Sequence, residues 1–184
     1  QTIFPPYLVV GAIYSGTAGI VTVMFVLRKF MDFGEYITEL HFDNLGKLLL
    51  VLSLLWSYIN IVEIFTGFYS GASGETEALR YRLFGFYAPL YWEMITFCAF
   101  LPLLCAFKRF RTSFVPMLVL SIAINIGMYT ERFLIVATSL SRQYLPDAWG
   151  LYVPSAVEIS ILAGTLALFT TMFLLFVKIF PSVS

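Results

Sequence analysis

The chain has 184 residues, of which 60% are hydrophobic and only 12% are charged. A soluble domain of this length needs more polar surface, so the composition excludes an ordinary soluble protein and indicates the membrane class. The formal net charge is +0 at pH 7, and no run of basic residues indicates nucleic-acid binding.

Five apolar stretches are long enough to cross a bilayer as helices. A transmembrane helix needs about 20 apolar residues, and its backbone polar groups are satisfied within the segment. The stretches comprise residues 7–27, 47–68, 86–107, 114–140 and 154–180. The sequence therefore predicts an all-α integral membrane helical bundle of about five transmembrane helices, formed as one domain by residues 1–184.

The first stretch begins close to Gln1, with no methionine and no basic segment before it, so no signal peptide is predicted. We expect the chain to be part of a longer polypeptide. Small residues recur on one face of this stretch, at a spacing that lets another helix approach closely. They are Gly11, Ser15, Gly19 and Thr22.

The third stretch contains Pro102, which predicts a kink because proline lacks an N–H and its ring crowds the preceding turn. Cys98 and Cys105 also lie here, on one helix face, so they cannot form a disulfide with each other. Since His41 is the one histidine and no cysteines are paired, we expect no haem and no iron–sulfur cluster on this chain.

Lysine and arginine near the span ends predict the orientation. Five spans place the connections after the first and third spans on the same side as the end of the fifth. That side carries Arg28, Lys29, Lys47, Lys108, Arg109, Arg111 and Lys178. The other side carries Arg80, Arg82 and Arg142. The first side is predicted to be cytoplasmic, with the N-terminus of this segment outside.

Ionisable groups inside the spans are candidates for function, because charge in a membrane interior is unfavourable. The alternating span directions place all of them in the outer half of the bilayer. They are Glu63, Glu93, Glu131, Arg132 and Glu158. We expect Arg132 to pair with an acid on another helix, because adjacent helical residues point about 100° apart.

Polar side chains extend these positions inward. Ser53, Ser57 and Asn60 form a stripe on the second span, and Ser121 and Asn125 share a face with the arginine of the fourth span. Such stripes either line a hydrated path or hydrogen-bond neighbouring helices.

His41 and Asp43 lie where the second span begins, and the histidine is either a proton-entry group or a helix cap. Together with the stripes and the acids of the spans, they form a predicted proton path that is interrupted near the middle. In the alternative interpretation Arg132 neutralises one acid, and the other acids are inert.

Several short segments occur in a distinctive order and cover almost the whole chain. They are IFPPYLVVGAIYSG, LRK, HFDNLGKLLL, YSG, SIAINIGMYTERFLIVATSL and YLPDAWG. In this order the chain resembles the NrfD-like family, the membrane subunits of polysulfide reductase and its relatives. Within that family it is most similar to the ActC-type quinol-oxidising membrane subunit of bacterial alternative complex III.

The resemblance implies a multi-pass subunit of the bacterial cytoplasmic (inner) membrane that is not catalytic alone. Such subunits bind a quinol, here expected to be menaquinol, near the outer face. They pass electrons to an iron–sulfur subunit, and in alternative complex III a multihaem cytochrome c subunit takes the electrons onward. Other membrane subunits and the lipid bilayer complete the partners. Family members have two bundles, of which this chain resembles the C-terminal one, whereas the quinol is bound mainly by the N-terminal bundle.

Other functions also fit the pattern of residues. The chain could anchor a related molybdoenzyme or hydrogenase complex, with a different soluble partner. It could also be half of a secondary transporter, with Glu63, Glu93 and Arg132 at the substrate site, although only Pro102 suggests the interrupted helices typical of transporters. A third alternative is a purely structural anchor.

Overall fold

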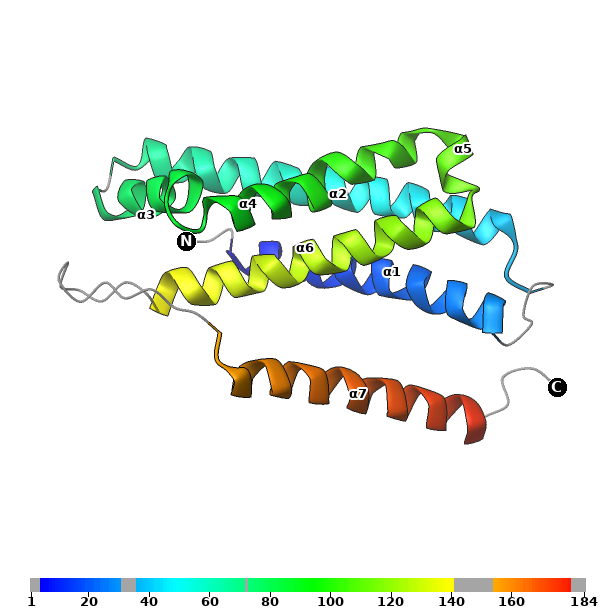
Figure 1. Ribbon diagram of the computed structural model, residues 1–184. Helices are drawn as coiled ribbons and strands as arrows, with labels where there is room; N and C mark the ends of the chain where they lie inside the picture. Colours follow the sequence, from blue (N-terminus) through cyan, green and yellow to red (C-terminus); the bar gives the residue numbers. More distant parts are fainter. Residues whose placement is uncertain (1–3, 31–35, 72, 141–153, 180–184) are drawn as a thin grey trace. The chain divides into compact units, whose positions relative to one another are not determined.

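The computed structural model describes residues 4–30, 36–71, 73–140 and 154–179. Within these ranges the chain is helical and contains no strand, which confirms the predicted all-α class. In chain order the elements are α1 (Phe4–Phe30), α2 (Glu39–Tyr69), α3 (Ser73–Phe84), α4 (Ala88–Ile95), the π-helical turn η1 (Thr96–Phe100), the 3₁₀ segment η2 (Leu101–Ala106), α5 (Lys108–Arg111), α6 (Phe114–Leu140) and α7 (Ala156–Ile179) (Figure 1).

Five helical segments of the described chain are long and apolar enough to cross a membrane, which confirms the predicted number of spans. They are Pro5–Lys29, Glu39–Tyr69, Ala88–Ala106, Phe114–Ala137 and Ala156–Ile179. Large apolar side chains such as Val9, Ile61 and Val119 are more than half exposed, as expected for surfaces that face lipid rather than water.

The second span begins at Glu39, eight residues before the predicted start at residue 47. Polarity suggested that residues 39–46 lie outside the span, but local contacts stabilise them as helix. Thr38 and His41 cap the first turn, and Asp43 is buried with cationic partners. The sequence also did not predict α3, a short helix that follows the left-handed Gly71 (φ 66°) in the second connection.

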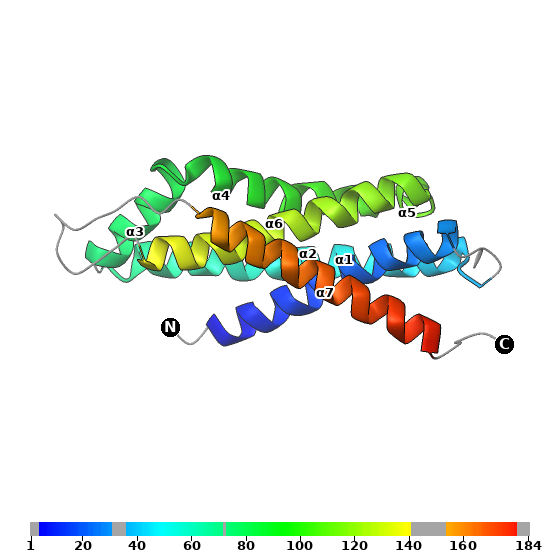
Figure 2. The same ribbon diagram turned by 60° about the horizontal axis from the view of Figure 1, so that its bottom comes forward.

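The described helices form two compact units, residues 1–139 and residues 140–184. In the first unit, α2 packs against α1, α3, α5 and both short segments η1 and η2. A hydrogen bond of 2.9 Å between the Thr22 and Ser121 hydroxyls joins α1 to α6, and α1, α2, α4 and α6 run lengthwise in Figures 1 and 2. The second unit contains α7, and a single bundle of residues 1–184 stays a prediction.

The third span changes its helical geometry at the predicted kink. Pro102 has no N–H to donate to the Cys98 carbonyl four residues earlier, and the chain passes from α4 through a π-helical turn into a 3₁₀ segment. The fully buried Tyr14 of α1 supplies a donor instead, because its hydroxyl donates to the Cys98 carbonyl at 3.0 Å. The π turn is thereby fixed against α1.

We expect Tyr14→Phe to lower the free energy of unfolding by about 1–2 kcal/mol, because it leaves a buried carbonyl without its side-chain donor. The matched control is Tyr58→Phe, since the Tyr58 side chain is 64% exposed. Thermal unfolding in detergent measures both variants. Equal unfolding temperatures for the two variants would show that the hydroxyl does not stabilise the π turn.

Candidate functional site

A buried polar cluster surrounds Glu131 of α6. The Glu131 side chain is fully buried, and its Oε1 accepts a hydrogen bond of 3.0 Å from the Trp56 indole N–H of α2. Its Oε2 has no hydrogen-bond partner among the described residues. A buried carboxylate depends on the few donors that reach it, because removing a charge from water is strongly unfavourable. The residues that form the Glu131 cluster are Tyr7, Trp56, Asn60, Glu63, Arg82, Tyr91, Glu131 and Arg132.

Arg132 provides the nearest cation. Its Nη2 lies 3.8 Å from Oε2 of Glu131, and its Nη1 is buried with no hydrogen-bond partner among the described residues. The guanidinium packs against Gly11 of α1, where a Cβ atom would lie 2.5 Å from Nη2. The sequence predicted a partner for Arg132 on another helix, but in the described part of the chain its acid is the adjacent Glu131. Glycine allows this arrangement because it leaves the space that the guanidinium occupies.

Two tyrosines and an asparagine extend the cluster from Glu131 towards α4. The Tyr7 ring stacks on the Trp56 ring with centroids 6.3 Å apart, and the Tyr7 hydroxyl lies 3.5 Å from the Asn60 amide nitrogen. The Asn60 carbonyl oxygen accepts a hydrogen bond of 3.0 Å from the Tyr91 hydroxyl. All three of these side chains are buried, so polar atoms from α1, α2 and α4 meet without water-exposed surface between them.

The cluster ends at an ion pair between α2 and α3. Nη1 of Arg82 lies 3.2 Å from Oε1 of Glu63, whose side chain is 33% exposed. The Arg82 guanidinium also lies over the Tyr91 ring, 5.7 Å from its centroid. The Glu131 cluster therefore runs from a fully buried carboxyl group to a partly exposed one and contains two acids and two arginines.

A groove of about 340 Å³ lies between α2 and the α3–η2 region, beside the Glu131 cluster. Apolar side chains such as Ile61, Ile95 and Leu103 form most of its lining, and its polar side chains include Ser57, Asn60 and Tyr91. Because Asn60 bonds to Tyr91 and the Ser57 hydroxyl bonds to the Ser53 carbonyl, the groove fits a hydrocarbon chain better than a polar ring.

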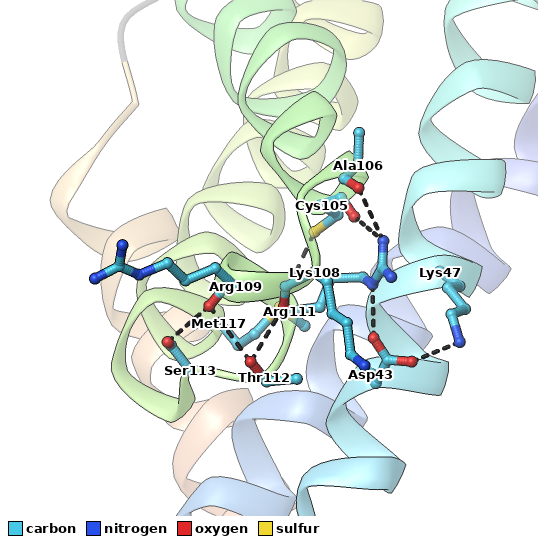
Figure 3. Close-up of polar contacts among 10 residues, drawn as sticks. All are labelled: Asp43, Lys47, Cys105, Ala106, Lys108, Arg109, Arg111, Thr112, Ser113 and Met117. Atoms are coloured by element: carbon cyan, nitrogen blue, oxygen red, sulfur yellow. Dashed lines mark hydrogen bonds and ion pairs between the residues drawn. The ribbon is translucent and has the colours of Figure 1, made fainter.

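A second polar cluster, the Asp43 cluster, consists of Asp43, Lys47 and Arg111 (Figure 3). The carboxylate of Asp43 accepts from Nε of Arg111 at 2.8 Å and from Nζ of Lys47 at 2.5 Å. Arg111 also donates through Nη1 to the Cys105 carbonyl at 2.7 Å and the Ala106 carbonyl at 3.1 Å. One guanidinium thus joins the start of α2 to the end of the third span.

Gly46 shapes the same contact, since a Cβ atom there would lie 2.9 Å from Cγ of Arg111. The aliphatic part of the arginine therefore crosses α2 directly over this glycine. Two cations close to one carboxylate stabilise its charged form. This arrangement favours a fixed ion pair at Asp43 over a group that changes its protonation.

His41 and the serines of α2 make local contacts in the structure. His41 is exposed, and its Nδ1 lies 2.9 Å from the Thr38 hydroxyl in a cap of the first α2 turn. The Ser53 and Ser57 hydroxyls donate to the carbonyls of Leu50 and Ser53, at 2.9 and 2.7 Å. Of the predicted α2 stripe, Asn60 hydrogen-bonds to polar side chains of other helices, Tyr7 of α1 and Tyr91 of α4.

The residues of the predicted stripe on α6 also make different kinds of contact. The buried Ser121 joins α6 to α1 through Thr22, which fits the interhelical hydrogen-bonding alternative. The Asn125 amide donates to the Ser121 carbonyl of its own helix at 2.9 Å. Only the end of the stripe, Arg132, belongs to the Glu131 cluster.

The two remaining predicted acids lie outside the cluster's contacts. Glu93 of α4 is half-buried and forms no ion pair with the described residues. Glu158 caps α7 within the second unit, where its Oε2 accepts from the Ser155 N–H at 2.7 Å. The depth that these acids share with Glu63 and Glu131 stays a prediction.

The aromatic and cationic partners of the predicted acids were not predicted from the sequence. Tyr7, Trp56 and Tyr91 were indistinguishable from aromatic residues that face lipid, although each carries a polar group that needs a partner when buried. Arg82 and Arg111 were used only to predict the orientation, as basic residues near the ends of the spans. A buried acid predicts that such donors exist, but the sequence does not show which residues supply them.

Residues 1–142 match the protein family described as polysulphide reductase, NrfD. The comparison with curated proteins gives no match. Within the part of the chain that the structure describes, no three His, Cys, Asp or Glu side chains gather into a metal-binding group.

Proposed function

The chain belongs to the polysulphide reductase NrfD family, and from this premise we propose that it is the ActC-type membrane subunit of a quinol-oxidising complex of the alternative complex III type. Proteins of the family are membrane subunits of quinol-linked redox complexes and partner with iron–sulfur and other redox subunits. The chain is a multi-pass membrane protein. The finer assignment is supported by the ordered segments from IFPPYLVVGAIYSG to YLPDAWG.

In this proposal the partners are an iron–sulfur subunit, a multihaem cytochrome c subunit and further membrane subunits. The complex lies in the bacterial cytoplasmic membrane, with the N-terminus of this segment outside. The basic residues near the ends of the spans support this orientation. The chain carries no haem and no cluster of its own, because it has one histidine and two cysteines on one helix.

The proposed electron donor is menaquinol, and the described residues do not form a site for its ring. The polar side chains of the groove bond within the protein, Asn60 with Tyr91 and Ser57 with the Ser53 carbonyl, so the groove fits an apolar chain better than a quinol ring. We therefore assign ring binding to the N-terminal bundle expected for the family.

The Glu131 cluster is the proposed outer part of a proton path. Glu131 is a titratable carboxyl group that is fully buried, with the Trp56 N–H at 3.0 Å and the Arg132 guanidinium at 3.8 Å. A buried acid beside a donor and a cation is the group of this cluster that we propose takes up and releases a proton. The unpartnered Oε2 of Glu131 and Nη1 of Arg132 are an acceptor and a donor that a proton or a water molecule would satisfy.

Glu63 is the proposed exit from this part of the path, since it is the partly exposed acid of the cluster. The Tyr7 and Tyr91 hydroxyls and the Asn60 amide lie between the two acids, where they orient water for transfer. The inner part, from His41 and Asp43 along Ser53 and Ser57, stays a prediction. Glu93, Ser121, Asn125 and Glu158 stay predicted members of the path.

Purification of the intact complex through this chain tests the proposed function, and mass spectrometry identifies its subunits. The expected result is a co-purifying iron–sulfur subunit together with a multihaem cytochrome c. A molybdopterin or hydrogenase subunit in their place would contradict the alternative complex III assignment and support the related anchor. Purification without any redox subunit would contradict the whole proposal.

A further inference from the structure

A basic surface adjoins the Asp43 cluster at the end of the first unit where α2 begins and α5 lies. We propose that Lys47 of α2 and Lys108 of α5 bind the headgroup phosphate of an anionic phospholipid there. The proposal is independent of the proposed redox function, since it depends only on charge, exposure and the level of this surface at the end of the spans.

The charge at this surface is positive in excess. Asp43 is one negative group, whereas Lys47, Arg111 and Lys108 are three positive ones, so these four residues carry a net charge of +2. Arg111 is only 12% exposed and already bonds to Asp43 and to two carbonyls, whereas the Lys47 side chain is 54% exposed. The excess charge therefore lies on the lysines.

Both lysines have donors to spare. The Lys47 side chain is 54% exposed and uses one contact for Asp43, although an ammonium group has three N–H donors. Lys108 is exposed and forms no ion pair with the described residues. In Figure 3 its side chain extends towards Asp43 and Lys47, while that of Arg109 points away, and α2 packs against α5.

The surroundings indicate a lipid rather than a soluble anion. Exposed apolar side chains flank the lysines, including Leu48 of α2, Phe107 beside α5 and Val115 of α6 at 45%, 67% and 63% exposure. The third span ends at Ala106 and the fourth begins at Phe114. A cationic group between apolar surfaces at this level meets phospholipid phosphates, while the apolar side chains contact acyl chains.

The test measures anionic phospholipid retained by the detergent-purified complex, using native mass spectrometry after reconstitution with phosphatidylglycerol and phosphatidylcholine. We expect the Lys47→Gln/Lys108→Gln variant to retain about tenfold less phosphatidylglycerol than the wild type. Arg80→Gln is the matched control, because Arg80 is exposed on α3 and forms no ion pair with the described residues. The single variant Lys108→Gln, at an exposed position, replaces the double variant if assembly suffers.

Several results would overturn the proposal. Equal phosphatidylglycerol retention in the variant and the wild type would exclude these lysines as a lipid site. Equal thermal protection of the lipid-stripped complex by inorganic phosphate and by phosphatidylglycerol vesicles would point to a soluble anion. Loss of a protein subunit with unchanged lipid would show that the surface binds an acidic partner segment.

Discussion

Replacing Arg111 with glutamine is expected to lower the unfolding temperature by about 5–10 °C. The guanidinium is the donor that connects the start of α2 to the carbonyls of Cys105 and Ala106. Charge-assisted hydrogen bonds of this kind contribute about 1.5–3 kcal/mol each. Glutamine is too short and too weak a donor to reach all three acceptors, so two carbonyls at the end of the third span lose their partner.

The matched control is Arg109→Gln, which removes the same charge from the same short helix. Arg109 is exposed and forms no ion pair with the described residues, so the unfolding temperature of the Arg109→Gln variant should stay near that of the wild type. The unfolding temperature of Arg111→Lys is expected to lie between those of Arg111→Gln and Arg109→Gln, because lysine keeps the charge but not the forked geometry. Equal effects of Arg111→Gln and Arg109→Gln would mean that the contact is not stabilising.

Replacing Glu131 with glutamine is expected to slow electron transfer from quinol through the assembled complex by about tenfold or more. Glutamine keeps the shape of the side chain and an oxygen that accepts from Trp56, but it cannot take up or release a proton. If the Glu131 cluster carries protons, proton transfer at position 131 becomes the rate-limiting step in the variant. The measurement is the steady-state rate in membrane vesicles at saturating quinol.

Glu39→Gln is the control for that rate, since Glu39 lies exposed in the first turn of α2 and outside the proposed path. The unfolding temperatures of both variants distinguish slow turnover by a folded complex from a loss of folding. If Glu131→Gln is folded and turns over at the wild-type rate, Glu131 and Arg132 are a structural pair and the proton path is wrong at this point.

The spans could be predicted because bilayer thickness fixes the length of an apolar helix, and five stretches met that length. The start of α2 was harder to predict from the sequence. Residues 39–46 resemble a polar connection, yet they are helical. Thr38 and His41 cap the first turn, and the Asp43 carboxylate is held by Lys47 one turn away and by Arg111, which lies 68 positions away in the sequence. Local and distant contacts together stabilise a boundary that polarity alone misplaced.

The candidate site was predictable in part for a similar reason. Ionisable residues in apolar spans identified Glu63, Glu131 and Arg132, because charge is unfavourable there. Their partners were not predictable, since Trp56 reaches Glu131 across 75 positions of sequence. Helical periodicity gives the face of a residue on its own helix but not which neighbouring helix it meets.

The geometry at Pro102 shows the same limit on a smaller scale. Proline alone predicts a kink, whereas the structure contains a π turn followed by a 3₁₀ segment. Tyr14 approaches this turn from α1 and donates to the Cys98 carbonyl. No pattern within the third span contains that information.

Protons released per electron in sealed vesicles test the central claim most directly. The assembled complex is reconstituted with its quinol, and an external pH indicator is read while the cytochrome is reduced. If the Glu131 cluster is part of the proton path, Glu131→Gln should release fewer protons per electron than the wild type and Glu39→Gln. An unchanged ratio in a Glu131→Gln complex that assembles and turns over would contradict the proposed role of the cluster.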